Sequence, residues 1–93
     1  MARTYRFTWD PEKARRNQRK HGVSFEEATS VFEDPELAYF SDLGDPGRFT
    51  AIGYSALARM LVVVHLEAGG TIRIISARKA SRHERMVYAK EKG

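Results

Sequence analysis

The main change in the spacing of hydrophobic residues along this chain occurs near Leu37. Before that point, apolar residues recur mostly at helical spacing, apart from a short alternating stretch near the N-terminus. After it they follow a period of two, which is typical of strands, until the last dozen residues. The pattern predicts a strand and two helices first, then four strands and a closing helix.

The N-terminal segment contains clear start and stop signals for a helix. Residues 6–9 alternate well enough to predict a short first strand. Asp10 is a good N-cap, and Pro11 suits the first helical position. We expect the helix to run through about Lys20 and to stop at Gly22, a favoured residue just beyond a helix C-terminus.

A second helix is predicted directly afterwards. Ser24 and Glu27 form a capping box at its start, and Asp34-Pro35 ends it. Its buried stripe is expected to contain Phe25, Ala28, Val31 and Phe32.

The remainder reads as a meander of strands closed by a helix. Ser81 and Glu84 form another capping box, which predicts a helix from Ser81 to about Lys90. The order β-α-α-β-β-β-β-α with short connections predicts an α+β fold: an antiparallel sheet of four to five strands packed by an N-terminal helical hairpin and a C-terminal helix. The later strands are expected at residues 37–40, 49–54, 60–67 and 71–77, with a loop at 41–47 and turns at 55–59 and 68–70.

Side-chain alternation predicts which residues of the last two strands share a face. Met60, Val62, Val64 and Leu66 are all apolar, so we expect them to face the helical hairpin together with Ile72 and Ile74. The opposite face would then contain His65, Glu67, Arg73 and Lys79, with Arg78 on the hairpin side. A single β-bulge would reverse part of this arrangement.

Composition is consistent with one small domain spanning residues 1–93. A hydrophobic content of 42% predicts a packed core, and the lack of cysteine fits a reducing cytoplasm without disulfides or thiolate metal sites. No apolar run approaches the roughly 20 residues that span a bilayer, and the N-terminus lacks the apolar stretch of a signal peptide. We therefore expect a cytoplasmic protein without membrane association.

Charge is distributed unevenly along the chain. Residues 3–20 and residues 73–92 each contain seven Lys or Arg and two acids, giving +5 apiece, whereas residues 21–72 contain two Arg and eight acids, giving −6. The sum is the net charge of +4. Two basic ends around an acidic middle predict a polyanionic partner, an acidic protein partner, or both.

Cations gather where the last strand meets the last helix. Arg78, Lys79 and Arg82 lie beside a predicted helix N-terminus, which by itself favours anions. Free backbone N–H groups and basic side chains together would bind phosphate oxygens, which predicts a phosphate site at this junction. The alternative is that these side chains extend into water without a ligand.

The three histidines are candidate proton carriers for metal-free RNA cleavage, which needs a base, an acid and cations that stabilise the phosphorane. His65 is best placed, near Glu67 and Arg73, although it could equally be a half-buried strand residue. His21 precedes Gly22 at a helix end, which favours a capping role, and His83 fits either role. The spacing of histidines and acids predicts no metal site, and no cofactor is expected.

The motifs resemble those of BrnT-type toxins of bacterial type II toxin–antitoxin pairs. The similarity rests on F-T-W-D-P-E-K-A-R-R-N-Q-R-K-H-G-V-S-F-E-E-A at 7–28 and I-R-I-I-S-A-R-K-A-S-R-H-E-R at 72–85, with V-F-E-D-P and F-T-A-I-G-Y-S between them. It implies a RelE-like fold and a ribonuclease that arrests translation. It also implies a BrnA-like ribbon-helix-helix antitoxin as partner, with operator DNA bound only through the toxin–antitoxin complex.

The matching motifs also suggest site residues. The predicted catalytic residues are Arg73, Arg78 and Lys79, together with His65, which lies outside the two long motifs. The predicted RNA- or phosphate-binding residues are Arg82, Lys20, His21 and Arg85. Two alternatives remain at this point: a basic module that holds nucleic acid without cleaving it, and a module that binds only an acidic protein.

Overall fold

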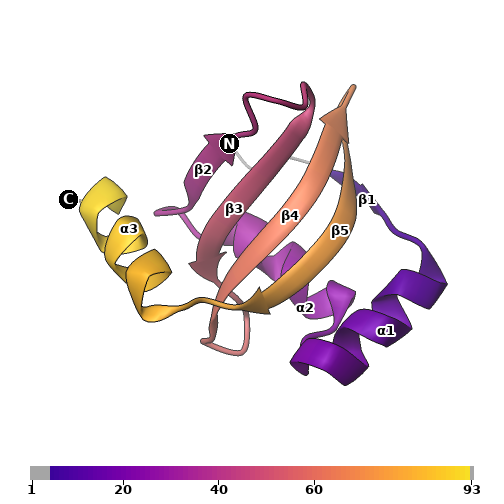
Figure 1. The fold of residues 1–93 in the computed structure, drawn as a ribbon, viewed down its shortest axis with the longest axis horizontal. Helices are drawn as coiled ribbons and strands as arrows, with labels where there is room; N and C mark the ends of the chain where they lie inside the picture. Colours follow the sequence, from indigo (N-terminus) through magenta and orange to yellow (C-terminus); the bar gives the residue numbers. More distant parts are fainter. Residues whose placement is uncertain (1–4, 93) are drawn as a thin grey trace.

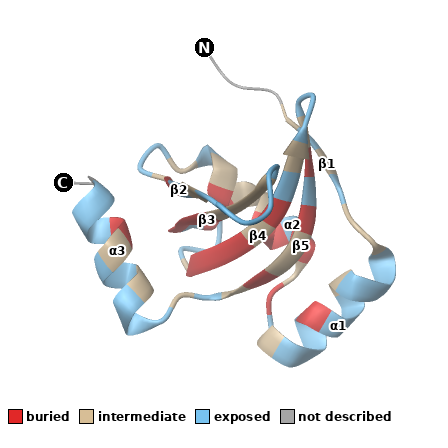
Figure 2. Ribbon diagram, turned by 45° about the horizontal axis from the view of Figure 1, so that its top comes forward, coloured by how far each residue is buried: buried red, intermediate tan, exposed pale blue. Residues whose placement is uncertain are grey.

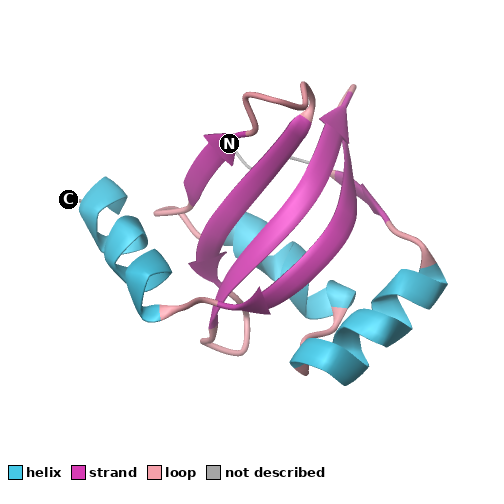
Figure 3. Ribbon diagram, in the orientation of Figure 1, coloured by secondary structure: helices cyan, strands magenta, loops and turns pink. Residues whose placement is uncertain are grey.

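The computed structural model describes residues 5–92, and its elements follow the predicted order (Figures 1 and 3). The single-domain prediction for residues 1–93 includes residues 1–4 and 93, which lie outside the described range. The elements are β1 (Arg6–Thr8), α1 (Pro11–His21), α2 (Phe25–Thr29), the 3₁₀ helix η1 (Ser30–Glu33), β2 (Ala38–Ser41), β3 (Arg48–Tyr54), β4 (Met60–Ala68), β5 (Thr71–Lys79) and α3 (Arg82–Lys92).

The five strands form one sheet in the order β1-β5-β4-β3-β2. Strands β2 to β5 are the predicted antiparallel meander, and β1 adds to it by pairing parallel to β5. Figure 1 shows α2 behind the sheet and α3 beside the β2 edge. The α+β fold predicted from the sequence is confirmed.

The predicted second helix changes geometry halfway along its length. Thr29 Oγ1 donates to the Glu26 carbonyl at 2.7 Å, and Ser30 Oγ donates to the Glu27 carbonyl at 2.6 Å. Hydroxyls that bond back three residues compete with the regular α-helical ladder. The chain accordingly continues as the tighter η1 rather than as the single helix that the pattern predicts.

The helical hairpin covers the face of β4 that carries Leu61 and Val63, not the face that carries Met60, so the predicted assignment is wrong. Both faces of β4 are apolar, and alternation alone therefore does not distinguish them. The β4–β5 turn decides the register, because Gly69 and Gly70 both have positive φ (57° and 83°), as a two-residue type I′ hairpin requires. The core cluster on the hairpin side consists of Val23, Phe25, Ala28, Val31, Leu61, Val63, Ile72, Ile74 and Ala77.

Strand β5 contains a β-bulge, and this bulge changes which of its basic residues share a face. Val64 pairs with Ser76 but His65 pairs with Ile74, so Ile75 is an extra residue in the strand. Because of that extra residue, Arg73 and Arg78 lie on the same face of the sheet, opposite Leu66 and Val62 respectively. Lys79, His65 and Glu67 lie on the hairpin side, so the prediction that groups them with Arg73 on the opposite face is wrong. The prediction that places Arg78 on the hairpin side is also wrong.

Helix α3 covers part of the other face of the sheet. Tyr88 is its buried anchor and packs with Ala38, Ile52, Met60 and Val62. The Tyr88 hydroxyl donates to Asp34 Oδ2 at 2.8 Å, and burial is the main cause that raises the pKa of Tyr88 to about 12. Most contacts of α3 with the sheet are to β2 and β3, and α3 reaches β4 only near Met60 and Val62 and β5 only at Arg78. Within the described chain, the rest of this face of β4 and β5 has no covering helix (Figures 1 and 2).

Asn17 joins α1 to the outer edge of β5. Its amide nitrogen donates to the carbonyls of Val23 (3.0 Å) and Ala77 (2.8 Å), and its Oδ1 accepts from the Ala77 N–H at 3.1 Å. Strand β1 pairs only with residues 71–73, so it does not reach this part of the β5 edge. The buried side chain of Asn17 therefore supplies the hydrogen bonds that another strand would provide.

Helices α1 and α3 have 11 residues each. Among the residues that the structure describes, no helix has the apolar length that crossing a bilayer requires.

Candidate functional site

The face of β4 and β5 that α3 leaves uncovered carries a row of basic and apolar residues. Register places Arg48 of β3 opposite Leu66 of β4, Leu66 opposite Arg73 of β5, and Arg73 beside Thr8 of β1. Paired residues share a face, and neighbouring strands lie about 4.8 Å apart. The backbones of Arg48 and Arg73 are therefore roughly 10 Å apart, with the 36% exposed Leu66 between them.

Two further arginines extend this surface. Arg6 pairs with Thr71 and lies on the same face, two residues from Thr8 along β1. Arg78 lies at the far end of β5, about 16 Å from Arg73 along the strand. We call Arg6, Arg48, Arg73 and Arg78 the basic face.

The guanidinium groups of the basic face differ in how strongly they are engaged. Arg73 is exposed and makes no side-chain hydrogen bond or ion pair within residues 5–92. Arg48 lies 3.9 Å from Asp42 and 4.0 Å from Asp45, in long contacts at a side chain that is 40% exposed. Exposed ion pairs of this kind contribute little, so both groups are accessible to an anionic ligand.

Sequence reasoning did not identify Arg6 and Arg48 as site residues. Arg48 falls one residue before the strand predicted at 49–54, and Arg6 is far along the chain from the other three arginines of the basic face. Part of this arrangement could have been predicted from the Gly69-Gly70 turn, because counting outward from a two-residue turn gives the register of β4 against β5. The longer β3–β4 turn does not fix its own register in the same way, so Arg48 required the structure.

Arg78 is held by Glu84 across the junction of β5 and α3. Its two terminal nitrogens donate to Glu84 Oε1 at 2.7 Å and Oε2 at 2.6 Å. Glu84 Oε1 also accepts from the Ser81 N–H at 2.8 Å, and the Glu84 N–H donates to Ser81 Oγ at 3.2 Å, which confirms the predicted capping box. A cation is accommodated beside this helix N-terminus because the capping carboxylate pairs with it.

This arrangement lowers the pKa of Glu84 from 4.5 to about 2, chiefly through its hydrogen bonds with Arg78. The folded pKa lies below the unfolded one, so the stabilisation is complete above pH 4.5 and is lost as the pH falls towards 2. The shift corresponds to about 3 kcal/mol, which solvent screening at the 44% exposed Arg78 reduces to about 1–2 kcal/mol.

We expect Glu84→Gln to lower the free energy of unfolding by about 1–2 kcal/mol at pH 7. The difference in unfolding free energy between the wild type and this variant should become smaller below pH 4.5. Urea unfolding of both proteins between pH 7 and pH 3 would measure it. Glu91→Gln, an exposed residue of the same helix, is the control and should change little. A gap that stays constant across this range would contradict the assigned role of the Arg78–Glu84 pair.

The remaining predicted basic site residues are dispersed. Arg82 and Arg85 are exposed in the first turn of α3, next to the end of β5 that carries Arg78. Lys79 is exposed at that end but faces the hairpin side of the sheet. Lys20 and His21 end α1, at the outer edge of β5. Only Arg82 and Arg85 therefore accompany the arginines of the basic face.

His65 is fully buried on the hairpin side of β4. Its ring lies edge-on to Phe32 and is stacked near Phe49, with centroid distances of 4.9 and 5.8 Å. Nε2 is 3.1 Å from the Tyr39 hydroxyl, whereas Nδ1 has no hydrogen-bond partner of acceptable geometry within the described chain. Burial lowers the pKa of His65, partly offset by the Val63 backbone and Glu67, so the ring is a neutral core residue.

In the part of the chain that the structure describes, no three His, Asp or Glu side chains lie close enough together to hold a metal ion. The described strand residues on the same side of the sheet as the basic face likewise include no histidine or carboxylate. This face presents guanidinium donors around exposed apolar and hydroxyl side chains, which suits a polyanion with apolar parts.

Comparison with known proteins identifies the family. A family model described as "Ribonuclease toxin, BrnT, of type II toxin-antitoxin system" matches residues 9–84. The fold is similar to the crystal structure of the Brucella abortus ribonuclease toxin BrnT, with a TM-score of 0.68 and 26% sequence identity, covering 85% of this chain and all of that one. Comparison with curated protein sequences gave no significant match. The resemblance inferred from the motifs is confirmed, and this chain belongs to the BrnT family of ribonuclease toxins of type II toxin–antitoxin systems.

Proposed function

We propose that this toxin is an endoribonuclease that binds and cleaves RNA on the basic face. The observation that carries the proposal is the row formed by Arg48, Leu66 and Arg73 on a sheet face that no helix covers. The guanidinium groups would contact the RNA backbone, and the exposed Leu66 between them would meet a sugar or a base. Regular paired strands hold these side chains, so little reorganisation is needed when RNA binds.

The proposed reaction is a phosphodiester transfer that requires no metal ion. The 2′-hydroxyl loses its proton and its oxygen bonds to the adjacent phosphorus, while the bond from phosphorus to the 5′-oxygen breaks and that oxygen gains a proton. The products are a 2′,3′-cyclic phosphate and a 5′-hydroxyl. The phosphorane gains negative charge on its non-bridging oxygens, and we assign Arg73, flanked by Arg48, to stabilise that charge.

Proton transfer needs a group outside the strands of the basic face. We nominate His83, which is exposed in the first turn of α3 on the same side of the sheet as Arg78. His65 is unsuited to this role, because it is buried on the opposite face.

The remaining predicted residues would act in binding rather than in the reaction. Arg82 and Arg85 would extend phosphate contacts along α3, and Arg78 would join them when RNA competes for its pairing with Glu84. Lys79, Lys20 and His21 lie away from the basic face, so they would contribute only to RNA that extends past the β5 edge.

In its biological setting, we infer that the toxin acts in the cytoplasm and arrests translation by cleaving RNA. A cognate ribbon-helix-helix antitoxin of the BrnA type would neutralise it, and operator DNA would be bound only through the complex of the two proteins. Membership of the family supports the antitoxin as partner, since a type II pair consists of a toxin and a protein that neutralises it.

The test is cleavage of a labelled RNA by purified protein in the presence of a chelator, together with induced expression in bacteria with and without the neighbouring antitoxin gene. We expect cleavage products ending in a cyclic phosphate, growth arrest with RNA loss, and rescue by the antitoxin. Salt-dependent RNA binding without cleavage would instead indicate a binding module. Activity that disappears with the chelator would overturn the metal-free mechanism.

A further inference from the structure

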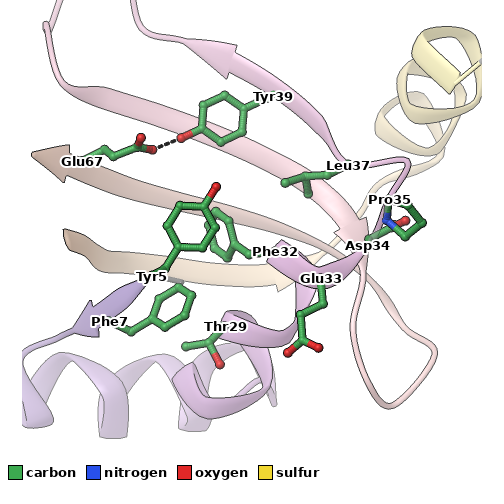
Figure 4. Close-up of a pocket in the computed structure, with 10 residues that line it drawn as sticks. All are labelled: Tyr5, Phe7, Thr29, Phe32, Glu33, Asp34, Pro35, Leu37, Tyr39 and Glu67. Atoms are coloured by element: carbon green, nitrogen blue, oxygen red, sulfur yellow. Dashed lines mark hydrogen bonds between the residues drawn. The ribbon is translucent and has the colours of Figure 1, made fainter. Parts of the chain in front are cut away.

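The hairpin side of the molecule contains an open groove whose lining is aromatic and acidic. Its volume is about 910 Å³, and it lies between β1, the end of the α2–η1 segment, β2 and the end of β4. Figure 4 shows its side chains: Tyr5, Phe7, Thr29, Phe32, Glu33, Asp34, Pro35, Leu37, Tyr39 and Glu67. Its described lining includes three carboxylates and no Lys or Arg. We call it the acidic groove.

The aromatic part of the groove is a connected cluster. Tyr5, Phe7 and Phe32 contact one another with ring centroids 5.5–6.0 Å apart, and all three are only partly buried. Rings that reach solvent in this way can bind aliphatic side chains, and their faces attract cations through the π-system. The groove therefore offers apolar contact area beside its carboxylates.

Two of the carboxylates lack a basic counterpart. Glu33 is exposed and has no ion pair with any Lys or Arg whose side chain the structure describes. Glu67 accepts a hydrogen bond from the Tyr39 hydroxyl, and the nearest basic side chain recorded for it is His65 at 3.7 Å, whose pKa is lowered by burial. Neither carboxylate is paired with a Lys or Arg of the described chain, in a protein whose net charge is +4.

We propose that the acidic groove is a docking site for a segment of a protein partner that carries Arg or Lys together with aliphatic side chains. The charge of the groove selects the cation, and the aromatic cluster binds both the aliphatic groups and the stem of the basic side chain. A polyanion such as RNA is excluded from this surface by the same carboxylates. The groove and the basic face lie on opposite sides of the sheet, so the proposal does not depend on where RNA is cleaved.

The test uses the full-length protein and an unbiased library of 12-residue peptides displayed on phage. Peptides are selected on the wild-type chain and counter-selected on the Glu33→Lys variant. We expect the recovered peptides to be enriched several-fold in Arg and Lys over the starting library. In solution, Glu33→Lys should raise their Kd at least about tenfold, because it places like charges together.

Glu26→Lys is the matched control, since Glu26 is exposed on α2, undergoes the same charge change and does not line the groove. It should leave the Kd within about twofold. RNA cleavage by both variants is measured on the same preparations and should stay at the wild-type rate. The proposal is overturned if no peptide depends on Glu33, if the recovered peptides are not enriched in basic residues, or if Glu26→Lys weakens binding as much as Glu33→Lys.

Discussion

Replacement of Arg73 by alanine is expected to reduce the rate of RNA cleavage by about 10²–10³ without lowering the melting temperature. The size of the effect is that of removing one preorganised donor from a charged transition state. Stability should be unaffected, because Arg73 is exposed and has no partner among the residues described. Single-turnover cleavage of a labelled RNA and a thermal melt of the same preparation would measure both quantities.

Two matched variants separate catalysis from charge. Lys79→Ala removes a cation from the same strand but from the opposite face, and it should change cleavage by less than about threefold if distant charge acts only through screened electrostatics. Arg73→Lys keeps the charge but loses the planar fork of donors, so it should recover only part of the activity. Equal losses in Arg73→Ala and Lys79→Ala would exclude the basic face as the specific site of cleavage.

Replacement of Asn17 by alanine is expected to lower the free energy of unfolding by about 2–4 kcal/mol. The change leaves the Ala77 N–H and the carbonyls of Ala77 and Val23 without their buried partner. Each unsatisfied buried group costs about 1–3 kcal/mol, and water that enters the gap recovers part of the loss. Against a total stability of about 5–15 kcal/mol, this loss is large and should lower the melting temperature by about 10 °C or more.

Gln18→Ala is the appropriate control, because Gln18 is the exposed neighbour of Asn17 on α1 and should change stability by less than about 0.5 kcal/mol. Asn17→Asp is a sharper test of the geometry. It keeps the acceptor for the Ala77 N–H but sets a carboxylate against two carbonyl oxygens, so it should be at least as destabilising as alanine. Urea unfolding gives the comparison, and an Asn17→Ala protein as stable as wild type would refute this account of the β5 edge.

The elements of the fold were predictable from sequence where local chemistry determines them. Asp10 caps α1 by accepting from the Glu12 N–H at 2.9 Å, Ser24 caps α2 by accepting from the Glu27 N–H at 3.0 Å, and Gly22 ends α1 with φ of 69°. These signals depend only on residues within one helical turn. The parallel pairing of β1 with β5 joins segments more than 60 residues apart, and no local pattern specifies it.

The side of the sheet on which each strand residue lies was harder to predict than the positions of the strands in the sequence. Residues 60–64 are apolar without interruption, so alternation along β4 gives two equivalent solutions. The residues of the candidate site are therefore equally ambiguous from sequence, because they depend on which face of the sheet each Arg or Lys occupies. Arg73 and Arg78 were recognised as candidates from their motif, but their common face and their neighbours Arg48 and Arg6 follow from register across the sheet.

The extra residue at position 75 has a consequence for how the motif tolerates changes in length. Arg73 and Arg78 are five positions apart, an odd number that regular alternation would send to opposite faces. Deleting Ile75 would make their separation even, so a bulge-free strand would still direct both arginines outward and Ile74 and Ala77 inward. A homologue shorter by one residue here can therefore preserve the same surface, and because positions 74 and 75 are both isoleucine, loss of either residue gives the same chain.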